Sequence, residues 1–196
     1  PSASDPSASD PSASDPRSAI PADTGIAPVV DSLLDLFAAA DGGLPEICIQ
    51  GLQGGEVTAL YGVLRGAARF LVGKPVYRDR RDRLDKPLDG EANPASLVVS
   101  GEAEPFHFLT RGIRVEGVDL PDLGVFVLPN AVALDYERGP WWGRAQVTAL
   151  FSLLRGLFAR AARPRVAYDA DTGRDEGERF ARALVTVCGL SAGDGG

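Results

Sequence analysis

The 196-residue chain has no methionine, one histidine and two cysteines, and these scarcities exclude several kinds of site. Cys48 and Cys188 cannot form a disulfide framework or a zinc site made only of thiolates. His107 is alone, which excludes any site that needs two imidazoles. No apolar run approaches the roughly 18 residues of a membrane-spanning helix. We therefore expect no metal, no cofactor and no membrane partner.

Positive charge is also in deficit, because 20 Lys and Arg stand against 27 Asp and Glu and give a net charge of −7. This balance argues against a nucleic-acid partner, since phosphate contacts need a basic face. It suits a protein partner that is itself basic. The lack of a targeting signal and the few cysteines favour a cytoplasmic location. The sequence does not determine the oligomeric state.

Three segments differ in composition. Residues 1–15 are three copies of Pro-Ser-Ala-Ser-Asp, and they predict a disordered tail over residues 1–25. Residues 191–196 are rich in glycine and predict a flexible tail. The region between them, 26–190, is long enough to bury a sizeable core and predicts a single globular domain.

Hydrophobic periodicity predicts an α+β fold in which helices flank a mainly antiparallel central sheet. Helices are expected over residues 28–40, 56–72, 144–162 and 175–189. Strands are expected over 47–49, 96–100, 106–110, 113–118, 124–128, 131–136 and 166–168. Residues 77–95 are expected to be mostly loop, because prolines and a glycine interrupt a polar stretch.

Two of these strands carry further signals. The Pro129-Asn130 turn predicts that 124–128 and 131–136 form a hairpin. In the second strand, alternation directs Val132, Leu134 and Tyr136 to one face and Ala133 and Asp135 to the other. The neighbours of His107 are both phenylalanine, so that histidine is expected to turn away from the core.

Two of the expected helices are similar in sequence. Residues 57–66 and 147–156 are identical at seven of ten positions. Each follows a strand-like segment and a turn with glycine, which predicts a duplicated strand–turn–helix unit and pseudo-two-fold halves at 26–95 and 96–190. A chance likeness of two amphipathic helices is the alternative. Glycine inside a helix costs about 1 kcal/mol relative to alanine, so Gly66 and Gly156 predict a close approach where the helices pack.

Several motifs resemble functional sites only in part. Residues 169–175 begin like a calcium loop but lack its central glycine and final glutamate, so they are expected to cap the last helix. Residues 51–55 could place an anion at a helix N-terminus, but no nucleotide-binding motif is present and a plain turn is expected. The mixed charges of 78–86 predict a solvated, self-paired segment, with an acidic partner as the alternative.

The stretch 135–143 combines three aromatic residues with three charged ones between an expected strand and an expected helix. Trp, Tyr and Arg are enriched at binding hot spots. The candidate binding residues are therefore Asp135, Tyr136, Arg138, Trp141 and Trp142. The alternative is that the tryptophans hold the loop on the core. We expect one of them to be buried and the other exposed.

Three classes of function remain open. The favoured one is a non-catalytic protein-interaction module, such as a small acidic inhibitor, an immunity-type protein or a chaperone-like protein. The second is a structural component that assembles through its pseudo-two-fold halves. The third, which the sequence disfavours, is a metal-free enzyme that uses Asp135, Glu137 and Arg138 together with Asp169.

Overall fold

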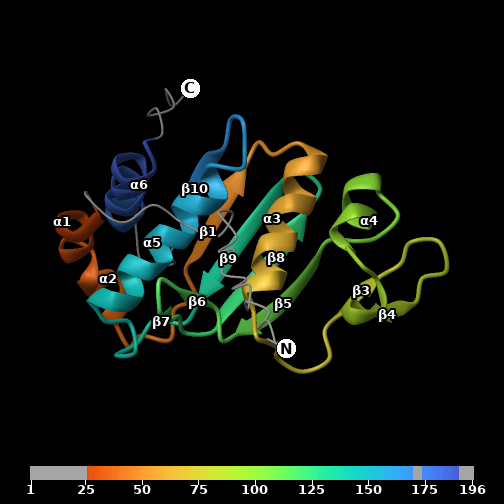
Figure 1. Ribbon diagram of the computed structural model, residues 1–196, viewed down its shortest axis with the longest axis horizontal. Coiled ribbons are helices and arrows are strands. Elements are labelled where there is room, and N and C mark those ends of the chain that lie inside the picture. Colours follow the sequence, from red (N-terminus) through yellow and green to blue (C-terminus); the bar gives the residue numbers. More distant parts are fainter. Residues whose placement is uncertain (1–25, 170–173, 190–196) are drawn as a thin grey trace, which may run out of the picture.

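The computed structural model describes residues 26–169 and 174–189 of the chain. The expected tails at 1–25 and 191–196 lie outside the described residues, as do Asp171 and Thr172 of the calcium-like segment. The described part has an α+β architecture, as expected, with a six-stranded antiparallel sheet flanked by helices (Figure 1).

The sheet has the strand order β10-β1-β9-β8-β5-β2, and every neighbouring pair is antiparallel. The expected hairpin is confirmed as the central pair β8 and β9, and the other expected strands at 47–49, 106–110 and 166–168 are present with slightly longer bounds. The strands are β1 (Glu46–Gln50), β2 (Phe70–Leu71), β5 (Phe106–Arg111), β8 (Leu123–Leu128), β9 (Ala131–Tyr136) and β10 (Arg165–Asp169).

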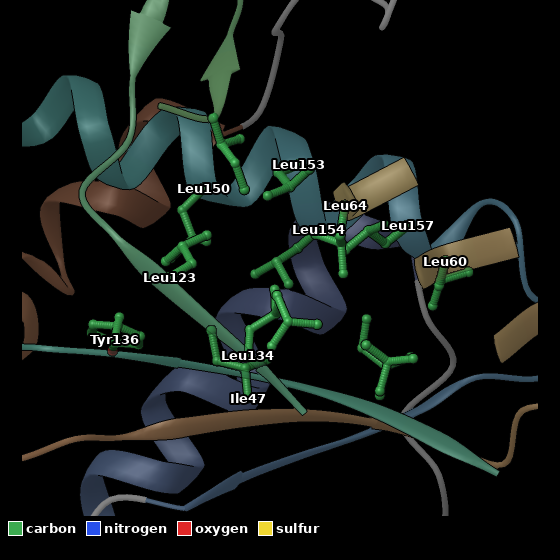
Figure 2. Close-up of a cluster of buried hydrophobic side chains, with 14 of the residues drawn as sticks. Ile47, Leu60, Leu64, Leu123, Leu134, Tyr136, Leu150, Leu153, Leu154 and Leu157 are labelled. Atoms are coloured by element: carbon green, nitrogen blue, oxygen red, sulfur yellow. The ribbon is translucent and has the colours of Figure 1, made fainter. Parts of the chain in front are cut away.

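Two long helices, α3 (Gly54–Ala67) and α5 (Arg144–Phe158), lie on one face of the sheet (Figure 1). Leu60 and Leu64 of α3 and the leucines of α5 meet the strand residues Ile47 and Leu134 in the main core (Figure 2). The alternation expected for β9 is confirmed, because Leu134 belongs to this core whereas Ala133 belongs to a separate small cluster. The sheet therefore has one face that packs against the helices and an opposite face that carries the small cluster.

Two short helices, α1 (Ile26–Asp31) and α2 (Leu34–Ala38), and the longer α6 (Arg174–Cys188) complete the helical layer beside α5 (Figure 1). Phe180 of α6 stacks on Tyr168 of β10 with 4.2 Å between ring centroids. The single helix expected over 28–40 is wrong. The Ser32 hydroxyl donates a 2.7 Å hydrogen bond to the carbonyl of Val29, and such local bonding offers the backbone an alternative to a continuous helix.

The expected helix over 56–72 is too long at its C-terminal end. α3 ends at Ala67, and the following residues join the sheet edge as β2. The amide of Arg69 donates to the carbonyl of Arg111 at 3.1 Å, and the amide of Val72 donates to that of Leu109 at 2.9 Å. Backbone pairing with β5 thus replaces the last helical turn.

The strand expected over 96–100 is instead the helix α4 (Ala95–Ser100). Pro94 precedes its first residue, and Gly101 follows its last residue with a φ of 80°. A proline at the start and a left-handed glycine at the end are ordinary helix boundaries. These end signals and the packing of α4 on α3 outweigh the strand preference of its two valines.

The loop expected over 77–95 contains the short hairpin β3 (Val76–Arg78) and β4 (Asp85–Pro87), followed by the 3-10 turn η1 (Leu88–Gly90). The salt bridges of Arg78 with Asp85 and of Lys86 with Asp79 lie within this region. The single strand expected over 113–118 is wrong, because this segment folds into a hairpin of two short strands, β6 (Arg114–Val115) and β7 (Val118–Asp119). The turn between them has a positive φ at Glu116 and at Gly117.

The prediction of a close approach at Gly66 is wrong. This glycine is exposed, and a Cβ atom built on it would meet no neighbouring atom within 4 Å. The helix simply tolerates glycine there. Gly156 is half-buried in α5, and for it the packing role stays a prediction. The internal duplication also stays a prediction.

Candidate interaction site

The two tryptophans of the 135–143 stretch differ in exposure. Trp142 is 2% exposed and packs against Phe37 and Tyr136, with ring centroids 5.3 and 5.0 Å away. Trp141 is 47% exposed. The expectation of one buried and one exposed tryptophan is confirmed.

The exposed tryptophan is held in a fixed position by the loop that carries it. Its indole Nε1 donates to the carbonyl oxygen of Glu137 at 3.2 Å, and Trp142 donates to the same oxygen at 2.8 Å. The ring covers Gly139, where an added Cβ would lie 2.4 Å from Cζ2 of Trp141. Only glycine leaves room for the ring at this contact. A large aromatic side chain is therefore presented to solvent with little rotamer freedom left to lose on binding.

Trp141 forms one wall of an open pocket of about 530 Å³. The other lining residues come from the segment between β7 and β8, from the end of β9 and from the first turn of α5. They are Asp119, Leu120, Pro121, Asp122, Glu137 and Gln146. The pocket thus combines an aromatic wall and apolar surface with three carboxylates.

Two of these three carboxylates have arginine neighbours. Asp122 accepts hydrogen bonds from Nε and Nη2 of Arg111 at 3.0 and 2.6 Å. Asp119 lies 3.8 Å from Nε of Arg114, and both side chains are largely exposed. Glu137 is exposed, and no ion pair joins its carboxylate to another residue in the described part of the chain. The pocket therefore keeps a net negative charge beside an indole face, which is the chemistry that attracts a cation.

Arg138 points to the interior, opposite to Glu137. It is 3% exposed and forms salt bridges with Asp41 at 3.2 Å and with Glu176 at 2.9 Å. These contacts tie the β9–α5 connection to the segment before β1 and to α6. A buried arginine with paired carboxylates is a structural connection between elements, so Arg138 is not available to a partner at the surface.

Tyr136 is also a core residue. It is 1% exposed, and its hydroxyl shares a 3.1 Å hydrogen bond with that of Tyr168. Burial raises the pKa of Tyr136 far above its usual value. Among the five candidate binding residues, the structure therefore buries Tyr136, Arg138 and Trp142 and leaves Trp141 as the one large exposed side chain. The sequence did not distinguish the buried candidates from the exposed one, because buried and exposed residues are interleaved along this stretch.

Asp135 lies on the sheet face that is turned away from α3 and α5. Its Oδ2 lies 2.6 Å from Nε2 of His107, and the imidazole is half exposed. The expectation that His107 faces away from the core is confirmed. The pair crosses β8 at Gly124, where an added Cβ would lie 2.2 Å from the carboxylate and 2.4 Å from the imidazole. Glycine at this position leaves the room for the His107–Asp135 contact.

Asp135 also belongs to a row of three carboxylates across neighbouring strands. Glu46 of β1 is directly opposite Asp135 of β9 on one side and Asp169 of β10 on the other. Like charges in opposed positions destabilise a sheet. Accordingly, burial, Asp135 and then Asp169 raise the pKa of Glu46, while His107 lowers it in part. We call these three residues the acidic row.

Glu46→Gln is expected to raise the melting temperature by about 2 °C at pH 7. The folded state raises the pKa of Glu46 above its unfolded value. The charged form therefore costs stability above that pKa, and the cost disappears when Glu46 is protonated in both states. Thermal unfolding of both proteins at pH 7 and pH 3 checks this. Equal melting temperatures at pH 7, or a difference that persists at pH 3, would contradict it.

The residues proposed for a metal-free enzyme do not share one cleft. Asp135 lies on the open sheet face, Glu137 lines the Trp141 pocket, and Arg138 is buried with Asp41 and Glu176. In the described residues, no group of His, Cys, Asp and Glu could hold a metal ion. None of the described helices is long and apolar enough to cross a membrane.

Three residues of these surfaces were not predicted from the sequence: Asp119, Asp122 and Glu46. Asp119 and Asp122 flank Leu120-Pro121, and this acidic pair around a proline was the signal that could have marked a loop at the surface. The only sign at Glu46 was its place at the start of an apolar strand. Comparison with protein-family models, with curated proteins and with solved structures finds no match to this chain.

Proposed function

We propose that this protein is a non-catalytic interaction module that binds a basic segment of a partner protein at the Trp141 pocket. The observation that carries the proposal is the exposed, positionally fixed indole of Trp141 beside the carboxylate of Glu137. A lysine or arginine side chain can lie on an indole face while its charge meets the carboxylate. The net charge of −7 favours a basic partner over a nucleic acid.

Such a module fits the class of small acidic inhibitors, immunity-type proteins and chaperone-like proteins, which act by covering a surface of another protein. A cytoplasmic location is part of the same proposal. Binding at a hot spot of this kind concentrates the energy in one aromatic side chain.

A peptide selection tests the proposal. Random dodecapeptides displayed on phage are selected on the wild-type protein and counter-selected on Trp141→Ala. We expect Lys- and Arg-containing peptides that lose about tenfold or more in affinity with Trp141→Ala, in line with an aromatic hot spot. Leu84→Ala is the matched control, since Leu84 is 60% exposed on the β3–β4 hairpin. Selected peptides that bind wild type and Trp141→Ala equally would contradict the proposal.

We also retain the duplication as a proposal. The units β1–α3 and β9–α5 start from adjacent antiparallel strands. The amide of Ala162, after α5, donates to Oε1 of Glu56 in the first turn of α3 at 2.6 Å. The end of one helix thus meets the start of the other, which is the arrangement that a two-fold axis perpendicular to the sheet produces. Assembly through these halves is the alternative function.

A further inference from the structure

The second face of the sheet has its own small apolar surface. Cys48, Ala131 and Ala133 are buried there, and Phe126, Leu128 and Ala167 pack against them half-buried. All six residues belong to strands, so no helix side chain joins this cluster in the described part of the chain. We call this surface, together with the acidic row, the open face.

Glu137, which lines the Trp141 pocket, directly follows β9 and lies two residues from Asp135 of the open face. Tyr136 and Arg138 are buried on the helix side, so Asp135 and Glu137 project to the opposite side. Residues two apart on a strand are separated by about 6.6 Å. The carboxylate of Glu137 in the pocket is therefore followed, one strand repeat away, by the acidic row.

Negative charge is concentrated at the acidic row, whereas the basic Arg165 lies at the other end of the same face of β10. Glu46 has carboxylates as its neighbours on both adjacent strands, and the imidazole of His107 is bonded to Asp135 alone. The energetic cost of this crowding falls when a cation approaches Glu46. Next to the acidic row, Cys48, Ala133 and Phe126 form a row of their own across β1, β9 and β8 and offer apolar contact to the same ligand.

We propose that the basic segment of the partner continues from the Trp141 pocket onto the open face, with a second cationic side chain at Glu46 and Asp135. This inference rests on the proposed function and adds the form of the ligand. In an extended peptide, alternate side chains point the same way at about 6.6 Å spacing. The ligand is therefore an extended segment with two basic residues separated by one residue, and its next side chain on the same side contacts the neighbouring apolar row.

Fluorescein-labelled synthetic peptides test this form. One is the heptapeptide Gly-Ser-Arg-Val-Arg-Ser-Gly, and the other replaces its second arginine with glutamine. Both are titrated by fluorescence anisotropy at 20 mM salt. The variants are Trp141→Ala in the pocket, Glu46→Gln in the acidic row, and Glu91→Gln as a control that removes the same charge from an exposed position beyond η1.

We expect Glu46→Gln to weaken binding of the two-arginine peptide by about three- to fivefold, because this is the effect of losing one partly exposed ion pair. The one-arginine peptide should change less than twofold, and Glu91→Gln should change neither. If Trp141→Ala weakens both peptides but Glu46→Gln and Glu91→Gln behave alike, the continuation is wrong and the pocket stands. If Trp141→Ala has no effect, the proposed function itself fails. Sedimentation that shows a dimer blocked by Glu46→Arg would assign the open face to a second copy and overturn the inference.

Discussion

Trp142→Ala is expected to lower the free energy of unfolding by about 4 kcal/mol, the scale of a deleted core aromatic. Trp142 packs against the stacked rings of Phe37 and Tyr136, and its indole Nε1 donates to the carbonyl of Glu137. Truncation removes these ring contacts, leaves a cavity under the β9–α5 connection and deprives the carbonyl of its shorter hydrogen bond. Urea unfolding followed by far-UV circular dichroism measures the effect.

Trp141→Ala is the matched control for this experiment. The same amino acid is truncated at the next position, but Trp141 is 47% exposed and contributes mainly its contact with Gly139. Its loss is expected to cost about 1 kcal/mol or less, as for most surface substitutions. Equal destabilisation by the two variants would contradict the assignment of one tryptophan to the core and the other to the surface.

Arg138→Met is expected to lower the free energy of unfolding by about 3 kcal/mol. Methionine keeps much of the apolar volume of the side chain but removes the guanidinium that pairs with Asp41 and Glu176. Asp41 and Glu176 then lose their common cation, and α6 loses a connection to the end of β9. The measurement is again equilibrium unfolding in urea.

The control for this variant is Arg182→Met in α6. Arg182 pairs with Glu178 at 3.5 Å, but both side chains are more than half exposed, at 69% and 58%. Surface pairs of this kind contribute about 0–1 kcal/mol. If Arg138→Met is no more destabilising than Arg182→Met, the salt bridges of Arg138 do not hold the β9–α5 connection in place.

Turn residues and hydrophobic alternation predicted the elements whose structure is set by neighbouring residues in the sequence. The turn at Pro129-Asn130 and the alternation of the following strand were sufficient to predict β8 and β9. The prediction for 96–100 was wrong because its valines favour a strand, whereas Pro94 and Gly101 mark the two ends of a helix. Likewise, the end of α3 depends on backbone bonds to β5, a partner that lies some 40 residues later in the chain.

The site was predicted only in part, for a geometric reason. The sequence marked the 135–143 stretch and expected one exposed tryptophan, but it could not say which one, since that depends on where the strand alternation ends. The acidic row brings together Glu46, Asp135 and Asp169, and only the strand order β10-β1-β9 makes them neighbours. In the sequence alone, these are three separate acidic residues at or near the ends of three expected strands.

We expect a ligand to contact Trp141 and not Trp142, and the two indole N–H signals in a proton–nitrogen NMR spectrum distinguish these two residues. The chain has two tryptophans, so Trp141→Phe assigns both signals. Titration with the two-arginine peptide should shift the Trp141 signal strongly, with a much smaller shift of Trp142 through the shared carbonyl of Glu137. A saturating peptide that leaves the Trp141 signal unmoved would contradict this expectation.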